Sequence, residues 1–144
     1  MLQGDFHGVL DDIRKRWGEM LYYDSTTCWE VFPGFYENTR TRSYCHAWSS
    51  APAALLQKYM LGVRMEEKGW RRASVSVPVM EDENITWCRG SIPTPYGRIY
   101  VDWDKKTHNY LLQVPETISL EIKIPDDYKL TIQKIKTEPV KKSL

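Results

Sequence analysis

The 144-residue sequence has few cysteines and no long hydrophobic run, and both absences exclude classes of protein. Cys28, Cys45 and Cys88 are odd in number, widely spaced and without a C-x-x-C pair, so we expect neither a disulfide framework nor a zinc knuckle. No window holds the roughly 18 apolar residues that a membrane-spanning helix needs. The N-terminus lacks the basic and apolar stretches of a secretory signal. We therefore expect a cytoplasmic chain with reduced thiols, although a fragment's N-terminus would say nothing about secretion.

Excess charge and nucleotide-binding motifs are also absent. The formal net charge is +1, which favours neither nucleic acid nor an acidic partner. No G-x-G-x-x-G motif or P-loop occurs, so nucleotide binding has no support. His7, His46 and His108 are too far apart for metal-ligand spacing. The sequence predicts no metal site, no cofactor and no membrane partner.

Two segments near the N-terminus have helical spacing. Apolar residues recur at three- and four-residue steps at Leu10, Ile13, Trp17, Met20 and Leu21, which predicts an amphipathic helix over about residues 6–23. A second helix is expected over about residues 50–61. Pro52 suits its first turn, and Gly62 can end it in a left-handed conformation.

After Gly62 the apolar period changes from 3.6 to 2, and about six half-buried strands follow. Turn signals at residues 81–84, 95–97, 105–107 and 125–127 separate the strands. The predicted fold is mainly β with a short helical lead, an antiparallel β-sandwich preceded by two helices. We expect a helical segment at residues 1–62, a β-sandwich domain at 63–138 and a polar tail at 139–144.

The loop between the two predicted helices is long and aromatic, and such loops are often functional. It brings a carboxylate, Glu30, beside the indole of Trp29, and further on an imidazole, His46, near Trp48. Indoles beside a carboxylate suit a sugar subsite, where rings contact the apolar face of a pyranose and a carboxylate can act as base. From the residues alone, a structural role for Glu30 and for His46 is the commoner outcome. A thiol nucleophile formed by Cys28 or Cys45 with His46 is disfavoured, because sequence neighbours rarely have the required geometry.

The same stretches resemble consecutive landmarks of bacterial α-L-rhamnosidases, glycoside hydrolase family 78. The matching stretches are 26–30 (TTCWE), 45–52 (CHAWSSAP), 59–64 (YMLGVR), 69–70 (GW), 77–78 (VP), 87–90 (WCRG) and 92–99 (IPTPYGRI). The resemblance as a whole covers roughly residues 8–124, in the family's order and spacing. The resemblance implies the end of an (α/α)6 barrel followed by the C-terminal β domain, and a rhamnosyl glycoside as substrate.

The resemblance also implies roles for single residues. The family's general base is the Glu of its T-x-W-E motif, which falls on Glu30 here. A histidine that contacts the sugar falls on His46. Trp29 would line the pocket, and Trp48, next to the matched histidine, is a second candidate for sugar contact.

The chain also departs from the family pattern. An (α/α)6 barrel needs about twelve helices, whereas two are expected here. An inverting mechanism also needs a second carboxyl group roughly 6.5–9.5 Å from the base, and Asp24 and Glu37 match no family motif. We therefore expect no sugar cleavage by this chain alone. Something must cover the apolar stripe of the first helix, either the missing barrel, the β domain or a second copy in a homodimer.

A non-catalytic alternative stays open. The β part could bind carbohydrate, or pack on a partner, through aromatic residues arranged in a row, for which the candidates are Trp87, Tyr96, Tyr100 and Trp103. Strand phase favours a core position for Trp87 and Trp103 and an exposed one for Tyr100.

Overall fold

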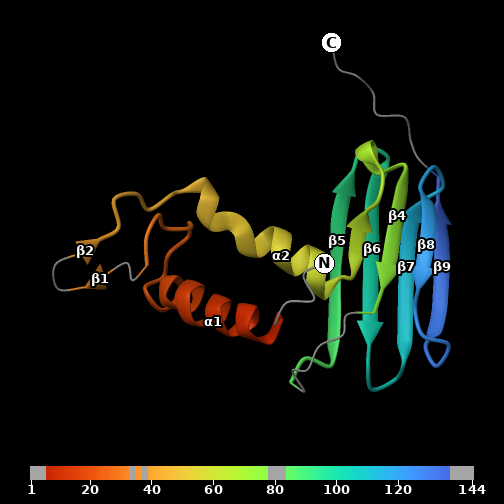
Figure 1. Cartoon of the computed structure of the whole chain (residues 1–144), viewed down its shortest axis with the longest axis horizontal. Helices are drawn as coiled ribbons and strands as arrows, with labels where there is room; N and C mark the ends of the chain where they lie inside the picture. Colours follow the sequence, from red (N-terminus) through yellow and green to blue (C-terminus); the bar gives the residue numbers. More distant parts are fainter. Residues whose placement is uncertain (1–5, 33–34, 37–38, 78–83, 137–144) are drawn as a thin grey trace, which may run out of the picture. The chain divides into compact units, whose positions relative to one another are not determined.

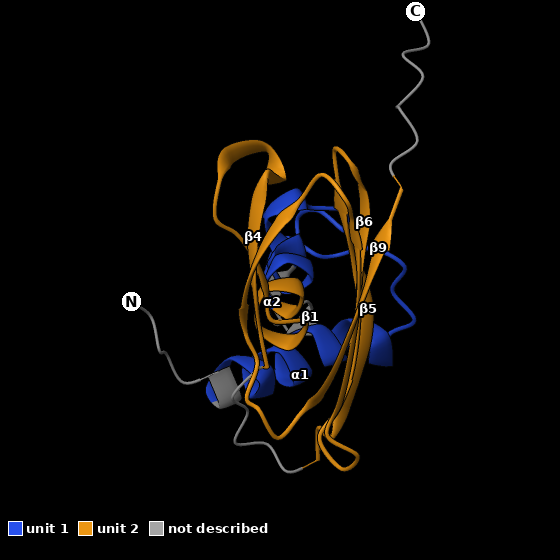
Figure 2. Ribbon diagram, turned by 90° about the vertical axis from the view of Figure 1, so that its right-hand side faces the viewer, with its two compact units in different colours: residues 1–55 blue, residues 56–144 orange. Residues whose placement is uncertain are grey.

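The computed structural model describes residues 6–32, 35–36, 39–77 and 84–136. Two compact units make up the chain, residues 1–55 and residues 56–144 (Figures 1 and 2). Glu37, the acidic residues 81–83 and the predicted tail at 139–144 lie outside the described residues. No helix within the described ranges is both long enough and apolar enough to cross a membrane.

The first unit begins with helix α1, Phe6–Tyr22, which confirms the helix expected from the apolar spacing. Leu10 and Met20 of its stripe are buried. Asp24 adopts φ +52° just after the helix, and the N–H of Ser25 bonds to the carbonyl of Met20. This left-handed residue turns the chain sharply out of the helix into the aromatic loop.

The rest of the first unit is loop, a small hairpin and the start of the second helix. Strands β1, Phe35–Tyr36, and β2, Thr39–Arg40, pair antiparallel. A 3-10 helix at Ala47–Ser50 leads directly into α2, Ala51–Met60, which confirms the second predicted helix. Pro52 lies in the first turn of α2, where its missing N–H leaves no helical hydrogen bond unmade.

The second unit contains two sheets, drawn as separate layers in Figure 2. The three-stranded sheet has the order β3 (Val63–Met65), β4 (Arg72–Ser76) and β8 (Ser119–Lys123), and a 3-10 helix at Lys68–Trp70 joins its first two strands. The four-stranded sheet has the order β5 (Trp87–Thr94), β6 (Gly97–Asp104), β7 (Asn109–Pro115) and β9 (Lys129–Ile135). The predicted mainly β sandwich with a helical lead is confirmed.

Strand direction differs from the expected antiparallel pattern in one pair of each sheet. β4 pairs with β8 in parallel, and β7 pairs with β9 in parallel. The reason is that β8 and β9 follow one another in sequence but belong to different sheets, so each joins the edge of a sheet whose other strands come earlier in the chain. Alternation of apolar residues reports which face of a strand is buried and carries no information about its direction. The short strand β3 was not predicted, because three residues are too few for a period to show.

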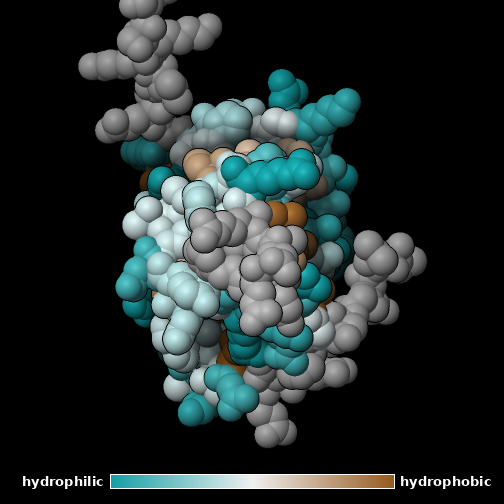
Figure 3. Space-filling model, turned by 90° about the vertical axis from the view of Figure 1, so that its left-hand side faces the viewer, coloured by the Kyte–Doolittle hydropathy of each residue, from teal (hydrophilic) through white to brown (hydrophobic). Residues whose placement is uncertain are grey.

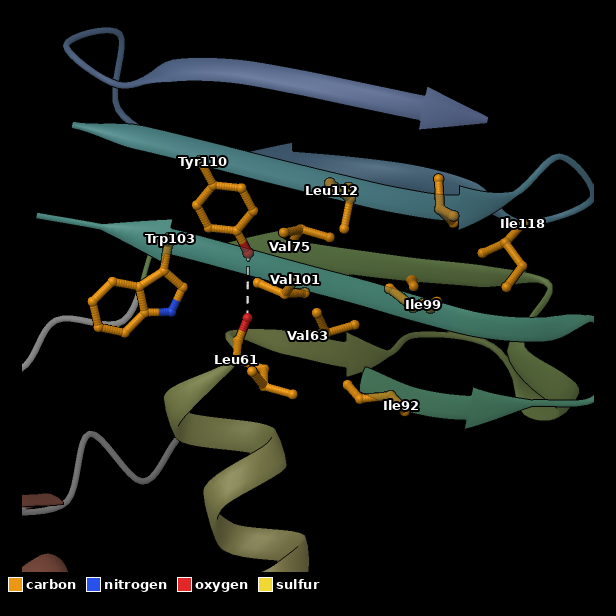
Figure 4. Packing of buried hydrophobic residues seen from close by; sticks show 12 residues of the cluster. Leu61, Val63, Val75, Ile92, Ile99, Val101, Trp103, Tyr110, Leu112 and Ile118 are labelled. Carbon is orange, nitrogen blue, oxygen red and sulfur yellow. Dashed lines mark hydrogen bonds between the residues drawn. The ribbon is translucent and has the colours of Figure 1, made fainter. Parts of the chain in front are cut away.

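The inward faces of the two sheets form one core (Figure 4). Its fully buried side chains come from both sheets and include Val75, Ile99, Val101, Trp103, Tyr110, Leu112, Val114 and Ile118. Trp103 and Tyr110 are directly paired across β6 and β7. The Trp103 indole donates to the carbonyl of Met60 at 2.7 Å, and the Tyr110 hydroxyl donates to the carbonyl of Leu61 at 3.2 Å. The two rings thus satisfy two carbonyls where the chain leaves α2, which a helix end alone would leave unpaired.

Gly62 has φ +66°, as expected of the residue that ends the second helix. The chain then enters β3, where Val63 pairs with Val75. The sequence prediction for the turn at residues 95–97 is likewise confirmed, because β5 ends at Thr94, β6 begins at Gly97, and these two residues pair. Gly97 has φ +118°, a value open to glycine and strained for other residues.

One of the aromatic predictions is wrong. Trp103 is fully buried and Tyr100 is 43% exposed, as expected, but Trp87 is 62% exposed and is not part of the core. The register explains this result, because Cys88 pairs with the inward-facing Trp103 while Trp87 pairs with Asp104. Directly paired residues share a face of the sheet, so Trp87 lies on the outer face. Tyr96 is half-buried and packs against the core.

Candidate functional site

The sequence-predicted site residues lie in two segments of the first unit, residues 26–30 and 43–49. Backbone hydrogen bonds hold these segments side by side: the N–H of Glu30 bonds to the carbonyl of Ser43 at 2.9 Å, and the N–H of His46 bonds to the carbonyl of Cys28 at 2.8 Å. The Thr27 hydroxyl adds a bond to the carbonyl of Tyr44. The two segments are therefore fixed by the main chain, and their side chains are positioned as a consequence.

Glu30 and His46 come together across this pair of segments. Their closest charged atoms, Glu30 Oε2 and His46 Nδ1, are 3.9 Å apart, and both side chains are partly exposed. That separation is longer than a direct hydrogen bond, so the carboxylate and the imidazole can each bond a third group placed between them. A half-buried carboxylate beside an imidazole can accept a proton from water or orient a sugar hydroxyl.

Trp48 lies beside the same pair. Its ring centroid is 4.2 Å from that of His46, and its indole N–H donates to the carbonyl of Glu30 at 3.1 Å. The side chain is 66% exposed, so one large aromatic surface stays open to solvent next to the carboxylate. An open indole face beside polar groups is suited to the apolar face of a pyranose.

Trp29 occupies the opposite side of its segment. It is only 2% exposed and contacts the rings of Tyr23 and Tyr44, each with a centroid distance of 6.1 Å. Neighbouring residues of an extended segment point to opposite faces, so the bonds that direct Glu30 outward direct Trp29 inward. Trp29 is therefore buried in this unit, and Trp48 is the indole that faces solvent.

Several residues that the sequence reasoning did not single out support the site. The Ser49 hydroxyl bonds to the carbonyl of Trp29, the Trp17 indole bonds to the carbonyl of Ser49 at 2.8 Å, and the Thr41 hydroxyl bonds to the carbonyl of Ser43 at 2.9 Å. Thr41 and Ser49 are buried polar residues, Ser49 within the 3-10 helix, and their burial is visible only in the structure. These bonds connect α1 to both segments of the site.

Two other titratable groups with shifted pKa values lie in the second unit. Burial raises the pKa of the Tyr110 hydroxyl and of the Cys88 thiol, which keeps both neutral in the core of the second unit. Among the described residues, no group of three or more His, Cys, Asp or Glu side chains is placed to hold a metal ion. The face drawn in Figure 3 is mostly hydrophilic, with hydrophobic residues only in small patches.

The second unit matches a known protein family. Residues 62–138 match the family model described as the bacterial alpha-L-rhamnosidase C-terminal domain. The chain belongs to this family. The α-L-rhamnosidase C-terminal domain therefore accounts for the β-sandwich of the second unit.

A solved structure extends the similarity beyond the sandwich. The crystal structure of the GH78 family rhamnosidase of Bacillus sp. GL1 matches with a TM-score of 0.69 and 38% identity, over 88% of this chain. That share is larger than residues 62–138, so the similarity reaches into the helical lead as well. The chain spans 14% of the length of the Bacillus sp. GL1 chain. No curated protein matches the sequence.

Proposed function

We propose that this chain is the C-terminal part of an α-L-rhamnosidase-like glycoside hydrolase and contributes the general base Glu30 to its active site. Residues 1–62 would correspond to the end of the catalytic barrel, and residues 63–138 to the β domain that follows it. The observation that carries the proposal is the position of Glu30 Oε2, 3.9 Å from His46 Nδ1, on segments that resemble the family's catalytic landmarks.

The proposed chemistry is inverting hydrolysis of a terminal α-L-rhamnosyl group. Glu30 takes a proton from a water molecule as the water oxygen bonds to the anomeric carbon, and the bond to the leaving oxygen breaks as a second carboxylic acid protonates it. His46 bonds a hydroxyl of the sugar, and Trp48 provides an aromatic surface beside it. The acid would come from barrel residues that this sequence does not contain, so we propose that the isolated chain is inactive.

Hydrolysis of p-nitrophenyl α-L-rhamnoside tests the proposal. The chain alone is expected to release no nitrophenol. A chimera in which this chain replaces the corresponding C-terminal segment of the Bacillus sp. GL1 rhamnosidase is expected to be active. Glu30→Gln in the chimera should lower kcat by about 10²- to 10⁴-fold, the usual effect of losing a general base.

Glu67→Gln is the matched control, because it makes the same chemical change at an exposed loop position of the second unit. Its kcat should equal that of the unmodified chimera. Equal activities of the Glu30→Gln chimera and the unmodified chimera would contradict the role of Glu30. Activity of the chain alone that disappears with Glu30→Gln would contradict only the inactivity of the isolated chain.

A packing role is the second candidate, and one observation favours it. Leu21 and Tyr22 at the end of α1 are strongly exposed for large apolar side chains, with Tyr22 at 81%. Helix ends of this kind are usually covered by a neighbour. The covering partner is either the missing barrel or a second copy. A solution mass twice that of the chain, returning to the single-chain value in Leu21→Ser, would support a homodimer.

A further inference from the structure

The outer face of the four-stranded sheet carries an ordered set of side chains that the proposed active site does not use. In the register of β5 and β6, Trp87 pairs with Asp104, Arg89 with Asp102, and Ser91 with Tyr100. These residues share the face opposite to the buried Ile99, Val101 and Trp103. Three successive cross-strand rows of β5 and β6 therefore lie on the outer face, with an aromatic residue in the first row and another in the third.

The two aromatic side chains are open to solvent. Trp87 is 62% exposed and Tyr100 is 43% exposed. Their rows are four residues apart along β5, which is roughly 13 Å at about 3.3 Å per residue. This distance exceeds the width of one pyranose ring, so a ligand that contacts both aromatic residues must contain at least two sugar units.

An ion pair occupies the row between them. Arg89 reaches Asp102 Oδ2 through Nε at 2.8 Å and through Nη2 at 2.7 Å. Among the described residues these bonds use only one of the two carboxylate oxygens, which leaves Oδ1 of Asp102 and Nη1 of Arg89 to bond a ligand. A carboxylate acceptor beside a guanidinium donor matches adjacent hydroxyl groups of a sugar, each of which both donates and accepts.

Along β5 and β6, the charge on this face is balanced. Arg89 offsets Asp102, and Arg98, whose Nη1 donates to the Ser91 hydroxyl at 3.1 Å, lies on the same face as Asp104. A balanced face gives no advantage to a charged ligand. Because an ion pair separates the two aromatic residues, they form no continuous apolar patch of the kind that protein partners cover. Both observations favour a neutral, hydroxyl-rich ligand.

We propose that this face, the Trp87–Tyr100 platform, binds a neutral oligosaccharide that lies along β5 and β6. The platform consists of Trp87, Arg89, Tyr100 and Asp102. One pyranose ring stacks on the Trp87 indole, a second stacks on the Tyr100 ring, and hydroxyl groups between them bond Arg89 and Asp102. The choice of rhamnose as the sugar rests on the proposed function, whereas the platform itself is independent of Glu30.

Titration of the full ¹⁵N-labelled chain with a linear tetrasaccharide of α-L-rhamnopyranosyl units tests the inference. The indole N–H signal of Trp87, assigned by its disappearance in Trp87→Ala, should shift in a saturable manner. Trp87→Ala and Tyr100→Ala, followed through the backbone amide signals of β5 and β6, should each weaken binding by about tenfold, because each removes one of the two ring faces on which a pyranose stacks. Both side chains are exposed, so the dispersed spectrum of the folded chain should persist in each variant.

Two control variants separate this site from the proposed active site. Tyr22→Ala removes an aromatic residue that is even more exposed and belongs to neither site, and it should leave binding unchanged. Trp48→Ala removes the exposed indole beside Glu30 and should also leave the Trp87 shift unchanged. Binding lost in Trp48→Ala and kept in Trp87→Ala would place the sugar near Glu30, which supports the proposed function and overturns the platform.

Two further results would also overturn the platform. One is the absence of any shift of the Trp87 signal at millimolar tetrasaccharide. The other is a dimeric solution mass that Trp87→Ala converts to the single-chain mass, because the face would then be an interface between copies. Neither result bears on hydrolysis by the chimera, so the proposed platform and the proposed role of Glu30 can be contradicted independently of each other.

Discussion

Tyr110 combines a buried hydroxyl with one hydrogen-bond acceptor, the carbonyl of Leu61. Burial is the main cause that raises the pKa of this hydroxyl, and the charge that Cys88 can carry adds to it. The folded chain therefore holds the tyrosine proton more tightly than the unfolded chain does. Proton binding of this kind makes stability depend on pH.

The Tyr110→Phe variant should lose about 1 kcal/mol of unfolding free energy at pH 7, because the carbonyl of Leu61 loses its donor. The sign of the pH effect follows from the raised pKa. The contribution of Tyr110 is fully present below the unfolded pKa near 10 and is lost as pH rises from there toward the higher folded value. The difference in stability between the two proteins should therefore shrink as the pH rises above about 10 in urea titrations. A constant difference would contradict the role of ionisation.

At the scale of the element, β5 passes very close to the end of α2. A Cβ atom added at Gly90 would lie 3.0 Å from Leu61 Cδ2 and 3.1 Å from Leu61 Cδ1. Leu61 is buried, and its carbonyl accepts the hydroxyl of Tyr110. Gly90 is thus needed for the close approach of the strand to this side chain.

Two opposing effects decide the outcome of Gly90→Ala. The loss of glycine's backbone freedom in the unfolded chain favours alanine by about 0.5–1 kcal/mol, whereas overpacking costs about 1–3 kcal/mol. We expect a net loss of about 1 kcal/mol, measured by urea unfolding. Gly18→Ala is the matched control, because a Cβ atom at Gly18 in α1 meets nothing within 4 Å. That variant should be neutral or more stable, and a stabilising effect at Gly90 would show that Leu61 moves aside.

Some of these elements were predictable from the sequence, and the burial of one strand residue was not. Both helices follow from the spacing of apolar residues, and the 95–97 turn follows from its Pro and Gly. Trp87 was expected in the core because Ile85 and Trp87 alternate with polar residues. In the structure, the pairing of Cys88 with Trp103 places Cys88 on the buried face of the strand and Trp87 on the outer face. The register of a strand depends on the strand with which it pairs, and the local pattern of apolar residues holds no information about that partner.

The candidate site was predictable in part for a related reason. The sequence identifies Glu30, His46 and Trp48 as chemically suitable, and the resemblance to the family suggests roles for the first two. What brings these residues together is a set of main-chain bonds, from Glu30 to Ser43 and from His46 to Cys28. Such bonds involve groups common to all residues, so no pattern of side chains predicts them.

At the scale of the whole molecule, the two units differ in their cores. The described residues of the second unit include twelve buried hydrophobic residues in one cluster. The described buried hydrophobic residues of the first unit are Leu10, Met20 and Trp29. Stability in a globular unit depends mainly on buried apolar surface, so the second unit should be the more stable.

Hydrogen exchange of the full chain in moderate urea measures this difference. Amides of β6 and β7 should stay protected at urea concentrations where those of α1 exchange freely, because the two units open separately. Joining the chain to the rest of the Bacillus sp. GL1 rhamnosidase in the chimera should raise the protection of α1 and leave that of β6 and β7 nearly unchanged. Simultaneous loss of protection in both units would contradict the prediction.

The pairing of β8 with β4 and of β9 with β7 has a consequence for the synthesis of the chain. A ribosome makes β4 and β7 before the strands that pair with their edges, so in a nascent chain the edges of β4 and β7 stay unpaired until residues 119–135 emerge. A premature stop before Ser119 would leave those edges permanently unpaired, in a form that adds strands from other molecules. The last strands to be translated are therefore the ones that keep newly made copies from pairing through β4 and β7.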